Sequence, residues 1–327
     1  MRKFLLLYIA LMLSFSPAAS YAVGKKSNKY VSTSSKHKVA KVKSSKSVSS
    51  KINHRIRAQK ASLDAYDGSG PLQLASAKAL VINQLTGETL YAKNTNLSTP
   101  IASVTKLMTA MVMLDAQLAM DDLLYIADED VDYLKGTHSR LSVGTSLTRG
   151  ELLQLALMAS ENRAAAALGR NYPGGIHTFI SAMNRKAEVL GMKSTHFLDA
   201  TGLSSSNVST AEDLVKMVNA AYHYPEIRQV TTMASQEITL YGRSNPLNFV
   251  NTNALVRGGN WLIGLSKTGF INEAGRCLVM QAEISGQPMI IVLLDSEGKL
   301  SRIGDANRIR KWIEYNDTNS LGENVSG

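Results

Sequence analysis

The sequence lacks a second cysteine: Cys277 is the only one among 327 residues, so no intramolecular disulfide can form. A lone cysteine in the apolar run Cys277–Met280 is most simply a buried small hydrophobic side chain. The six histidines are scattered and show no metal-ligand spacing. The sequence therefore predicts neither a disulfide-stabilised scaffold nor a metal site, and no cofactor is expected.

The sequence also lacks a membrane-spanning segment at its N-terminus. The apolar run Phe4–Phe15 is shorter than the roughly 20 residues that a spanning helix needs. A basic pair precedes this run, and the small residues Ser20 and Ala22 follow it in the positions of a leader-peptidase site. This arrangement is typical of a secretory signal. We therefore predict that residues 1–22 are cleaved on export, in preference to serving as a membrane anchor.

Acidic residues are absent from positions 25–60, where twelve residues are Lys or Arg and Ser is frequent. Such a segment cannot bury enough apolar surface to offset the entropy of ordering. We predict a disordered linker at 23–62, which acts as a solvated tether or makes weak contact with an anionic surface. Without residues 1–60, the formal charge of +10 becomes −4. A nucleic-acid-binding domain would carry its basic residues on the fold, so nucleic acid is not an expected partner.

The remaining segment, 63–316, is long enough for one large core or two joined lobes. Periodicity predicts strands at 78–83, 89–92, 261–268, 276–284 and 288–294. It predicts helices at 104–118, 149–159, 162–171, 176–190, 211–222 and 303–315. Strands at both ends and helices between them predict an α/β (α+β) fold, with an antiparallel sheet flanked by helices and an inserted helical lobe. Residues 121–147 are expected to form loops with short strands, and 317–327 a disordered tail.

A Ser-x-x-Lys pattern occurs three times, at Ser35/Lys38, Ser103/Lys106 and Ser296/Lys299. The second copy differs because it begins a strongly periodic helix. Residues three apart share a helix face, so the Lys106 amine can reach the Ser103 hydroxyl. The helix N-terminus also places positive potential where an oxyanion would develop. This pair predicts a serine nucleophile with a lysine base.

Two further short patterns follow in order along the chain. Ser160-Glu161-Asn162 lies between two predicted helices, although Ser205-Ser206-Asn207 also fits S-x-N. Lys267-Thr268-Gly269 ends a predicted strand and is the only K-T-G in the chain. Each pattern alone is weak. The ordered set S-x-x-K, S-x-N and K-T-G, each in its expected local structure, is characteristic of class A β-lactamases and penicillin-binding proteins.

With these motifs the sequence resembles the low-molecular-mass penicillin-binding proteins, the D-alanyl-D-alanine peptidases, over nearly all of residues 70–315. The resemblance extends to Pro100–Ser103 and to Asp199–Leu203 with Asn207, Ser209 and Thr210. Residues 157–166, 268–270 and 277–280 are similar to the endopeptidase branch of the family.

This resemblance implies a β-lactamase/transpeptidase-like fold and a location in the periplasm. It also implies hydrolysis of peptidoglycan cross-links between D-Ala and a diamino acid through a Ser103 acyl-enzyme. Peptidoglycan peptides are then the expected substrates, and β-lactam antibiotics are expected to act as covalent inhibitors. The anionic surface met by the linker would be the wall or the membrane.

The family pattern also implies a role for each motif residue. Ser103 is expected to be acylated, Lys106 to be the base, Ser160 to relay a proton to the leaving amine, and Asn162 to position Lys106 and the substrate amide. The substrate is expected to bind at Lys267, Thr268, Gly269 and Phe270, with the N–H groups of Ser103 and Phe270 forming an oxyanion hole. A lysine acts as a base only when neutral, and burial together with the second cation Lys267 would lower the pKa of Lys106.

Three other functions remain open from the sequence. A D-Ala-D-Ala carboxypeptidase needs a cation for the terminal carboxylate of its substrate, and the spacing of Arg302 does not identify it as that group. A non-catalytic penicillin- or wall-binding protein is disfavoured by the intact set of motifs. A β-lactamase is more distant, because no separate E-x-x-L-N loop supplies a deacylating glutamate.

Overall fold

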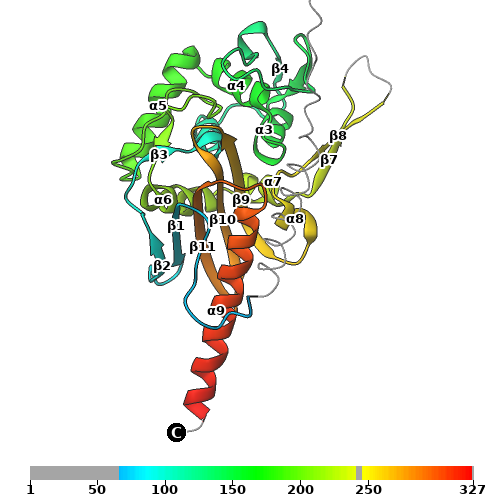
Figure 1. Cartoon of the computed structure of the whole chain (residues 1–327). Helices are drawn as coiled ribbons and strands as arrows, with labels where there is room; N and C mark the ends of the chain where they lie inside the picture. The colour runs from blue at the N-terminus through cyan, green and yellow to red at the C-terminus, as the bar shows by residue number, and fades with distance from the viewer. Residues whose placement is uncertain (1–65, 241–244, 326–327) are drawn as a thin grey trace, which may run out of the picture. The chain divides into compact units, whose positions relative to one another are not determined.

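The structure is a computed structural model of the chain that describes residues 66–240 and 245–325 (Figure 1). The predicted signal at 1–22 and the predicted linker at 23–62 lie outside the described residues. Within the described part of the chain, no helix combines the length and apolar character needed to cross a membrane.

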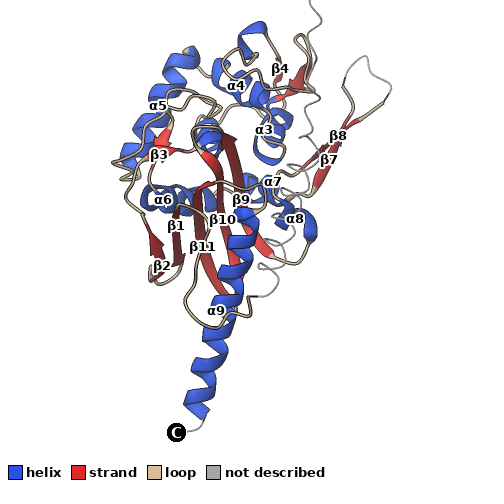
Figure 2. Cartoon of the chain, in the orientation of Figure 1, coloured by secondary structure: helices blue, strands red, loops and turns tan. Residues whose placement is uncertain are grey.

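A five-stranded antiparallel sheet with the order β2-β1-β11-β10-β9 forms the centre of the fold (Figure 2). Its strands are β1 (Lys78–Asn83), β2 (Thr89–Lys93), β9 (Leu262–Ile271), β10 (Gly275–Ile284) and β11 (Gln287–Ser296). The N-terminal strand β1 pairs with β11, from Lys78 opposite Leu294 to Asn83 opposite Met289. All five predicted strands are present, and β9 continues past its predicted end at Thr268 to Ile271.

Both faces of the central strands are covered, which explains their nearly continuous apolar sequence. In β10, Cys277 and Val279 pack into the core shared with the helical lobe. The alternate residues Leu278 and Met280 pack into a second core beneath the C-terminal helix α9 (Ser301–Val325). Successive side chains of a strand point to opposite faces, so one strand serves both cores. Cys277 is fully buried, as predicted, and burial raises the pKa of its thiol to about 11.

The middle of the chain forms the helical lobe. Its helices, with the short ones that follow, are α2 (Lys106–Asp115), α3 (Arg149–Met158), α4 (Asn162–Arg170), α5 (Gly175–Val189), α6 (Ala211–Tyr222), α7 (Pro225–Thr232) and α8 (Ala254–Gly258). The sequence missed α7 and α8, which are short. Thr210 caps α6 by accepting a hydrogen bond from the backbone N–H of Asp213 at 3.2 Å.

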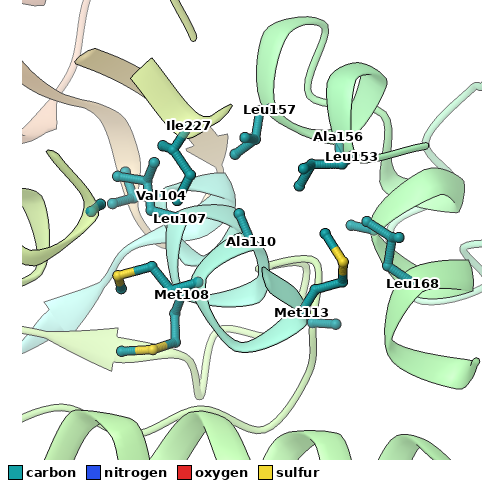
Figure 3. Packing of buried hydrophobic residues seen from close by; sticks show 14 of the residues in the cluster. Val104, Leu107, Met108, Ala110, Met113, Leu153, Ala156, Leu157, Leu168 and Ile227 are labelled. Carbon is teal, nitrogen blue, oxygen red and sulfur yellow. The ribbon is translucent and has the colours of Figure 1, made fainter. Parts of the chain in front are cut away.

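Helix α2 lies at the centre of the lobe and is buried on nearly all sides. Leu107, Met108 and Ala110 face different neighbours, which include Leu157 of α3 and Ile227 of α7 (Figure 3). A helix that is apolar on all sides is buried in a core. The packing around α2 holds the N-terminal end of this helix against the sheet. The predicted helix 104–118 begins instead as a 3₁₀ turn, η1 (Ala102–Thr105), before α2 starts at Lys106.

Three two-stranded ribbons complete the described fold: β3 (Thr99–Pro100) with β6 (Val208–Ser209), β4 (Leu123–Tyr125) with β5 (Ser146–Thr148), and β7 (Ser235–Ile238) with β8 (Leu247–Val250). The predicted loops with short strands at 121–147 correspond to β4, β5 and the 3₁₀ turn η2 (Asp128–Asp130).

The prediction for the C-terminus was wrong. Helix α9 runs to Val325, so most of the segment 317–327 is helical and not a disordered tail. The sequence there lacks apolar periodicity, which favoured disorder. Once a helix is nucleated by packing, however, each further residue adds a backbone hydrogen bond without a new nucleation step. The buried residues Ile309 and Ile313 provide that nucleus.

Candidate active site

Ser103 lies in the 3₁₀ turn η1, and Lys106 is the first residue of α2. Lys106 Nζ lies 2.8 Å from Ser103 Oγ. The turn is held by a close approach of Gly202, whose φ is +83°. A Cβ on Gly202 would lie 1.9 Å from the carbonyl oxygen of Ala102, so only glycine permits this contact. Ala102 itself has a φ of +47°, a strained conformation of the kind found at functional sites.

Lys106 is completely buried and has three partners. Besides Ser103, its amine lies 2.7 Å from Asn162 Oδ1 and 2.6 Å from the backbone carbonyl oxygen of Thr201. Burial lowers the pKa of Lys106 to about 7, although the carboxylates of Asp199 and Glu161 act in the opposite direction. A large fraction of Lys106 is therefore neutral near pH 7.

The identity of these partners fixes what the neutral amine can do. A neutral amine has two N–H donors and one lone pair. Asn162 Oδ1 and the Thr201 carbonyl only accept hydrogen bonds, so they take the two donors. Ser103 is the one partner that can donate, and its hydroxyl therefore faces the lone pair of Lys106. This is the geometry required of a general base acting on a serine nucleophile.

A second serine–lysine pair completes the site. Lys267, in β9, is 1% exposed, and its amine donates to Ser160 Oγ at 2.9 Å and to the Thr268 carbonyl at 3.1 Å. The pKa of Lys267 is lowered well below its ordinary value by burial, and further by the positive charges of Lys106 and Arg302. Ser160 has a φ of +60°, which is unusual for a residue other than glycine.

The edge strand β9 forms one wall of the site, because it is the last strand of the sheet. A Cβ on Gly269 would lie 2.9 Å from the Ile101 carbonyl and 3.0 Å from Ser103 N, so the strand approaches the nucleophile closely. The Thr268 hydroxyl donates to Thr252 Oγ1 at 2.7 Å. Phe270 is about half exposed, with the Arg276 guanidinium 4.4 Å from its ring centre. An unpaired strand edge can accept an extended peptide by backbone hydrogen bonding.

The structure brings together the residues predicted from the three motifs. Ser103, Lys106 and Asn162 form one hydrogen-bonded group, and Ser160 and Lys267 form a second. The competing copies of two motifs have other roles. Ser296 is buried in β11, 2.7 Å from Ser76 Oγ, and Asn207 is buried and accepts hydrogen bonds from the backbone of 198–199.

Four residues at the site were not predicted. The Thr201 carbonyl contacts Lys106, and Arg302 NH1 donates to the Gly269 carbonyl at 3.1 Å. The Thr137 hydroxyl accepts a hydrogen bond from the Asn162 amide, and Asp132 in turn accepts one from the Thr137 hydroxyl. A backbone carbonyl carries no signature in the sequence. The position of Arg302 just after the last strand was the only available signal.

The part of the chain that the structure describes contains no group of three His, Cys, Asp or Glu side chains able to hold a metal ion.

Comparison with known proteins agrees with this geometry. Residues 65–298 match the model of a family described as D-alanyl-D-alanine carboxypeptidase. A D-alanyl-D-alanine endopeptidase of Pseudomonas aeruginosa is 47% identical over 253 residues, which cover 77% of this chain and 82% of that protein. One of Escherichia coli is 46% identical over 242 residues, 74% of this chain and 78% of that protein. The crystal structure of a Streptomyces DD-transpeptidase superimposes with a TM-score of 0.69 at 30% identity, covering 75% of this chain and 98% of that one.

Proposed function

Because the chain belongs to the D-alanyl-D-alanine carboxypeptidase family of serine peptidases, we propose that it is a D-alanyl-D-alanine endopeptidase that cleaves peptidoglycan cross-links through an acyl-enzyme on Ser103. The observation that carries this proposal is the environment of Lys106. Its buried amine has a pKa of about 7, and its lone pair faces the only donor among its three partners.

Acylation follows from this arrangement. The Ser103 hydroxyl gives its proton to the neutral Lys106 amine while Oγ attacks the carbonyl carbon of D-Ala. The carbonyl oxygen becomes an oxyanion, which the N–H groups of Ser103 and Phe270 stabilise. When the tetrahedral intermediate collapses, the C–N bond breaks and the leaving amine takes a proton that Ser160 relays from the Lys267 ammonium group. Lys267 donates to Ser160 and so supports this relay.

Deacylation reverses the same steps with water as the nucleophile. Water loses a proton through Ser160 to the amine of Lys267, which gave up its own proton during acylation, and attacks the ester carbon. Ser103 Oγ then leaves with the proton held by Lys106. The peptide held along β9 is released with a new carboxylate. Thr268 and Gly269 belong to β9, along which the peptide backbone would bind, and Asn162 holds the Lys106 amine.

The choice between endopeptidase and carboxypeptidase rests on two observations. The relatives at 46–47% identity are named endopeptidases, whereas those named carboxypeptidases are 26–31% identical. The second candidate, a D-Ala-D-Ala carboxypeptidase, is favoured by one contact. Arg302 reaches the Gly269 carbonyl beside the substrate strand, where a cation for a terminal carboxylate belongs.

The surroundings of the enzyme follow from the sequence and from this activity. Peptidoglycan peptides lie outside the inner membrane, so the proposed location is the periplasm, reached by means of the signal at 1–22. The basic linker at 23–62 would tether the peptidase domain or weakly contact the anionic wall or membrane surface. A non-catalytic binding protein is disfavoured, because the site keeps a base and a nucleophile in contact.

Two measurements test the proposal. Purified protein incubated with defined muropeptides should convert cross-linked dimers to monomers faster than it removes D-Ala from pentapeptides, as followed by mass spectrometry. A labelled penicillin should form an ester on Ser103. Ser103→Ala should abolish both activities, and Ser35→Ala, from the competing motif in the linker, should retain both. Unchanged labelling of Ser103→Ala would refute the assignment.

A further inference from the structure

The Asn162 amide makes a second contact on the side away from Lys106. Its Nδ2 donates to Thr137 Oγ1 at 2.9 Å, and the Thr137 hydroxyl donates to Asp132 Oδ2 at 2.6 Å. With the 2.7 Å contact between Asn162 Oδ1 and Lys106 Nζ, an unbroken line of hydrogen bonds runs from a carboxylate to the base. None of the three sequence motifs contains Asp132 or Thr137.

This line of hydrogen bonds has a fixed direction. An ionised carboxylate only accepts, so the Thr137 hydroxyl must donate to Asp132. Its proton is then used, and only its lone pairs are available to Asn162. The amide of Asn162 must therefore present its NH₂ group to Thr137 and its oxygen to Lys106. Shape alone gives the amide no such preference, since its two ends are nearly the same in size.

The orientation of that amide decides whether Lys106 can act as a base. With Oδ1 towards the amine, one N–H of neutral Lys106 is taken up and the lone pair stays directed at Ser103. If the amide were rotated by half a turn, its N–H would point at Lys106 and donate to the same lone pair. The Ser103 proton would then have no acceptor.

Asp132 is held in the state that this role requires. Partial burial raises the pKa of its carboxyl, but the hydrogen bond from Thr137 and those from three backbone N–H groups outweigh it and lower the pKa overall. Those N–H groups belong to Leu134, Lys135 and Thr137. Asp132 is therefore ionised, and only an acceptor, at neutral pH.

Two further hydrogen bonds join the loop that carries Asp132 and Thr137 to residues of the S-x-N motif and the residue that follows it. The Ser139 hydroxyl donates to Glu161 Oε2 at 2.6 Å, and Arg163 NH1 donates to the Leu141 carbonyl at 2.7 Å. Loss of the Thr137 hydroxyl alone therefore leaves the loop attached. This allows its effect on Asn162 to be measured separately from an effect on loop structure.

We propose that Asp132 and Thr137 are positioning residues that fix the orientation of the Asn162 amide and thereby keep the lone pair of Lys106 directed at Ser103. The proposal deepens the proposed function and rests on it. Neither residue touches the substrate: they act through Asn162.

The test compares Thr137→Val, Thr137→Ser and Asp132→Asn with the matched control Asp128→Asn. Asp128 is an exposed aspartate of the nearby turn η2 for which no side-chain hydrogen bond is found among the described residues. The measurement is the second-order rate constant for acylation by a labelled penicillin between pH 5 and 9, together with the melting temperature. The charged groups that interact electrostatically with Lys106 are Asp199, Glu161 and Lys267, and they are unchanged in every variant.

Thr137→Val should lower the high-pH plateau of acylation by roughly tenfold or more, because a productive base is present in only part of the molecules. The midpoint of its pH profile should also move to lower pH, since an amide N–H facing Lys106 disfavours the ammonium form. Asp132→Asn should show the same two changes. Thr137→Ser should restore both plateau and midpoint, and Asp128→Asn should match wild type.

Two outcomes would overturn the proposal. The first is a folded Thr137→Val protein that keeps the wild-type plateau and midpoint. This result would overturn the proposal even if Asp132→Asn were impaired, because Asp132 would then act only through the structure of the loop. The second is failure of Thr137→Ser to rescue. Absence of penicillin acylation in the wild-type protein would overturn the proposed function as well, so the two failures are distinguishable.

Discussion

The amine of Lys267 lies 2.9 Å from the hydroxyl of Ser160, which repeats the 2.8 Å contact between Lys106 and Ser103 on the other side of the same site. Each serine has its own buried lysine. Burial lowers the pKa of both lysines, and for Lys267 the charge of Lys106 adds to the effect. In the proposed mechanism one pair removes the Ser103 proton, and the other supplies a proton to the leaving group.

The rate of acylation should rise as pH increases through about 7, because only neutral Lys106 can accept the Ser103 proton and its pKa is about 7. Between pH 5 and 6 the rate should change roughly tenfold per pH unit. Stopped-flow measurement of acylation by a fluorescent penicillin would provide the profile. A rate independent of pH from 5 to 8 would contradict the assignment of Lys106 as base.

The stability of the protein should also depend on pH through Lys106. Its folded pKa, about 7, lies below the value of about 10.4 for an exposed lysine. Between these values the unfolded chain binds a proton that the folded chain does not, so stability rises with pH across this window. Lys267 acts in the same direction.

Lys106→Met should therefore flatten the increase in melting temperature from pH 7 to 10. Differential scanning calorimetry at several pH values would measure it. Lys299→Met removes an exposed lysine and should leave the increase unchanged. Equal slopes for wild type and Lys106→Met would show that Lys106 is not a desolvated amine.

Gly269→Ala should slow acylation by roughly tenfold to a hundredfold, because misplacement of a nucleophile by a fraction of an ångström is costly. The new Cβ would lie 2.9 Å from the Ile101 carbonyl and 3.0 Å from Ser103 N, so β9 and η1 must separate by a few tenths of an ångström. Gly258→Ala is the matched control, since a Cβ there meets no atom within 4 Å. Equal acylation rates for the two variants would show that the close approach of β9 is not required.

The parts of the site that the sequence predicts are those fixed by local spacing. Ser103 and Lys106 are three residues apart around the start of a helix, and Lys267 and Gly269 lie on one strand. Their identities and spacing are sufficient to predict the chemistry. The fold followed similarly from periodicity, because each long strand or helix has an apolar pattern of its own.

The contacts that the sequence could not predict depend on tertiary packing. Lys106 meets the carbonyl of Thr201, and any residue has a carbonyl, so no side-chain type marks that position. Thr137 is exposed in a loop without periodicity, and only its placement beside Asn162 gives it a role. The extension of α9 to Val325 was missed because it depends on helix propagation and not on burial.

Removal of residues 1–61 should leave the chemistry intact, because the motif residues that form the site all lie between Ser103 and Gly269. A truncated protein beginning at Ser62 should cleave soluble muropeptides at the full-length rate. It should bind intact sacculi or anionic vesicles less tightly than the mature full-length protein, most visibly at low salt, because exposed charges are screened as salt rises. Cosedimentation at two salt concentrations would measure this. Loss of activity on soluble substrate would instead show that the linker docks onto the peptidase domain.

Arg302 provides the discriminator between the two peptidase activities. Its NH1 donates to the Gly269 carbonyl, and its Nε is buried with no hydrogen-bond partner among the described residues. A carboxypeptidase would use this cation for the terminal carboxylate of a pentapeptide, whereas an endopeptidase must leave room there for a cross-linked residue. Arg302→Ala should therefore change the rate of dimer cleavage less than about threefold. Lys299→Ala, an exposed cation nearby in the sequence, is the control and should have no effect on either substrate. Rapid pentapeptide trimming by the wild-type protein with dimers untouched, and its loss in Arg302→Ala, would identify the enzyme as a carboxypeptidase.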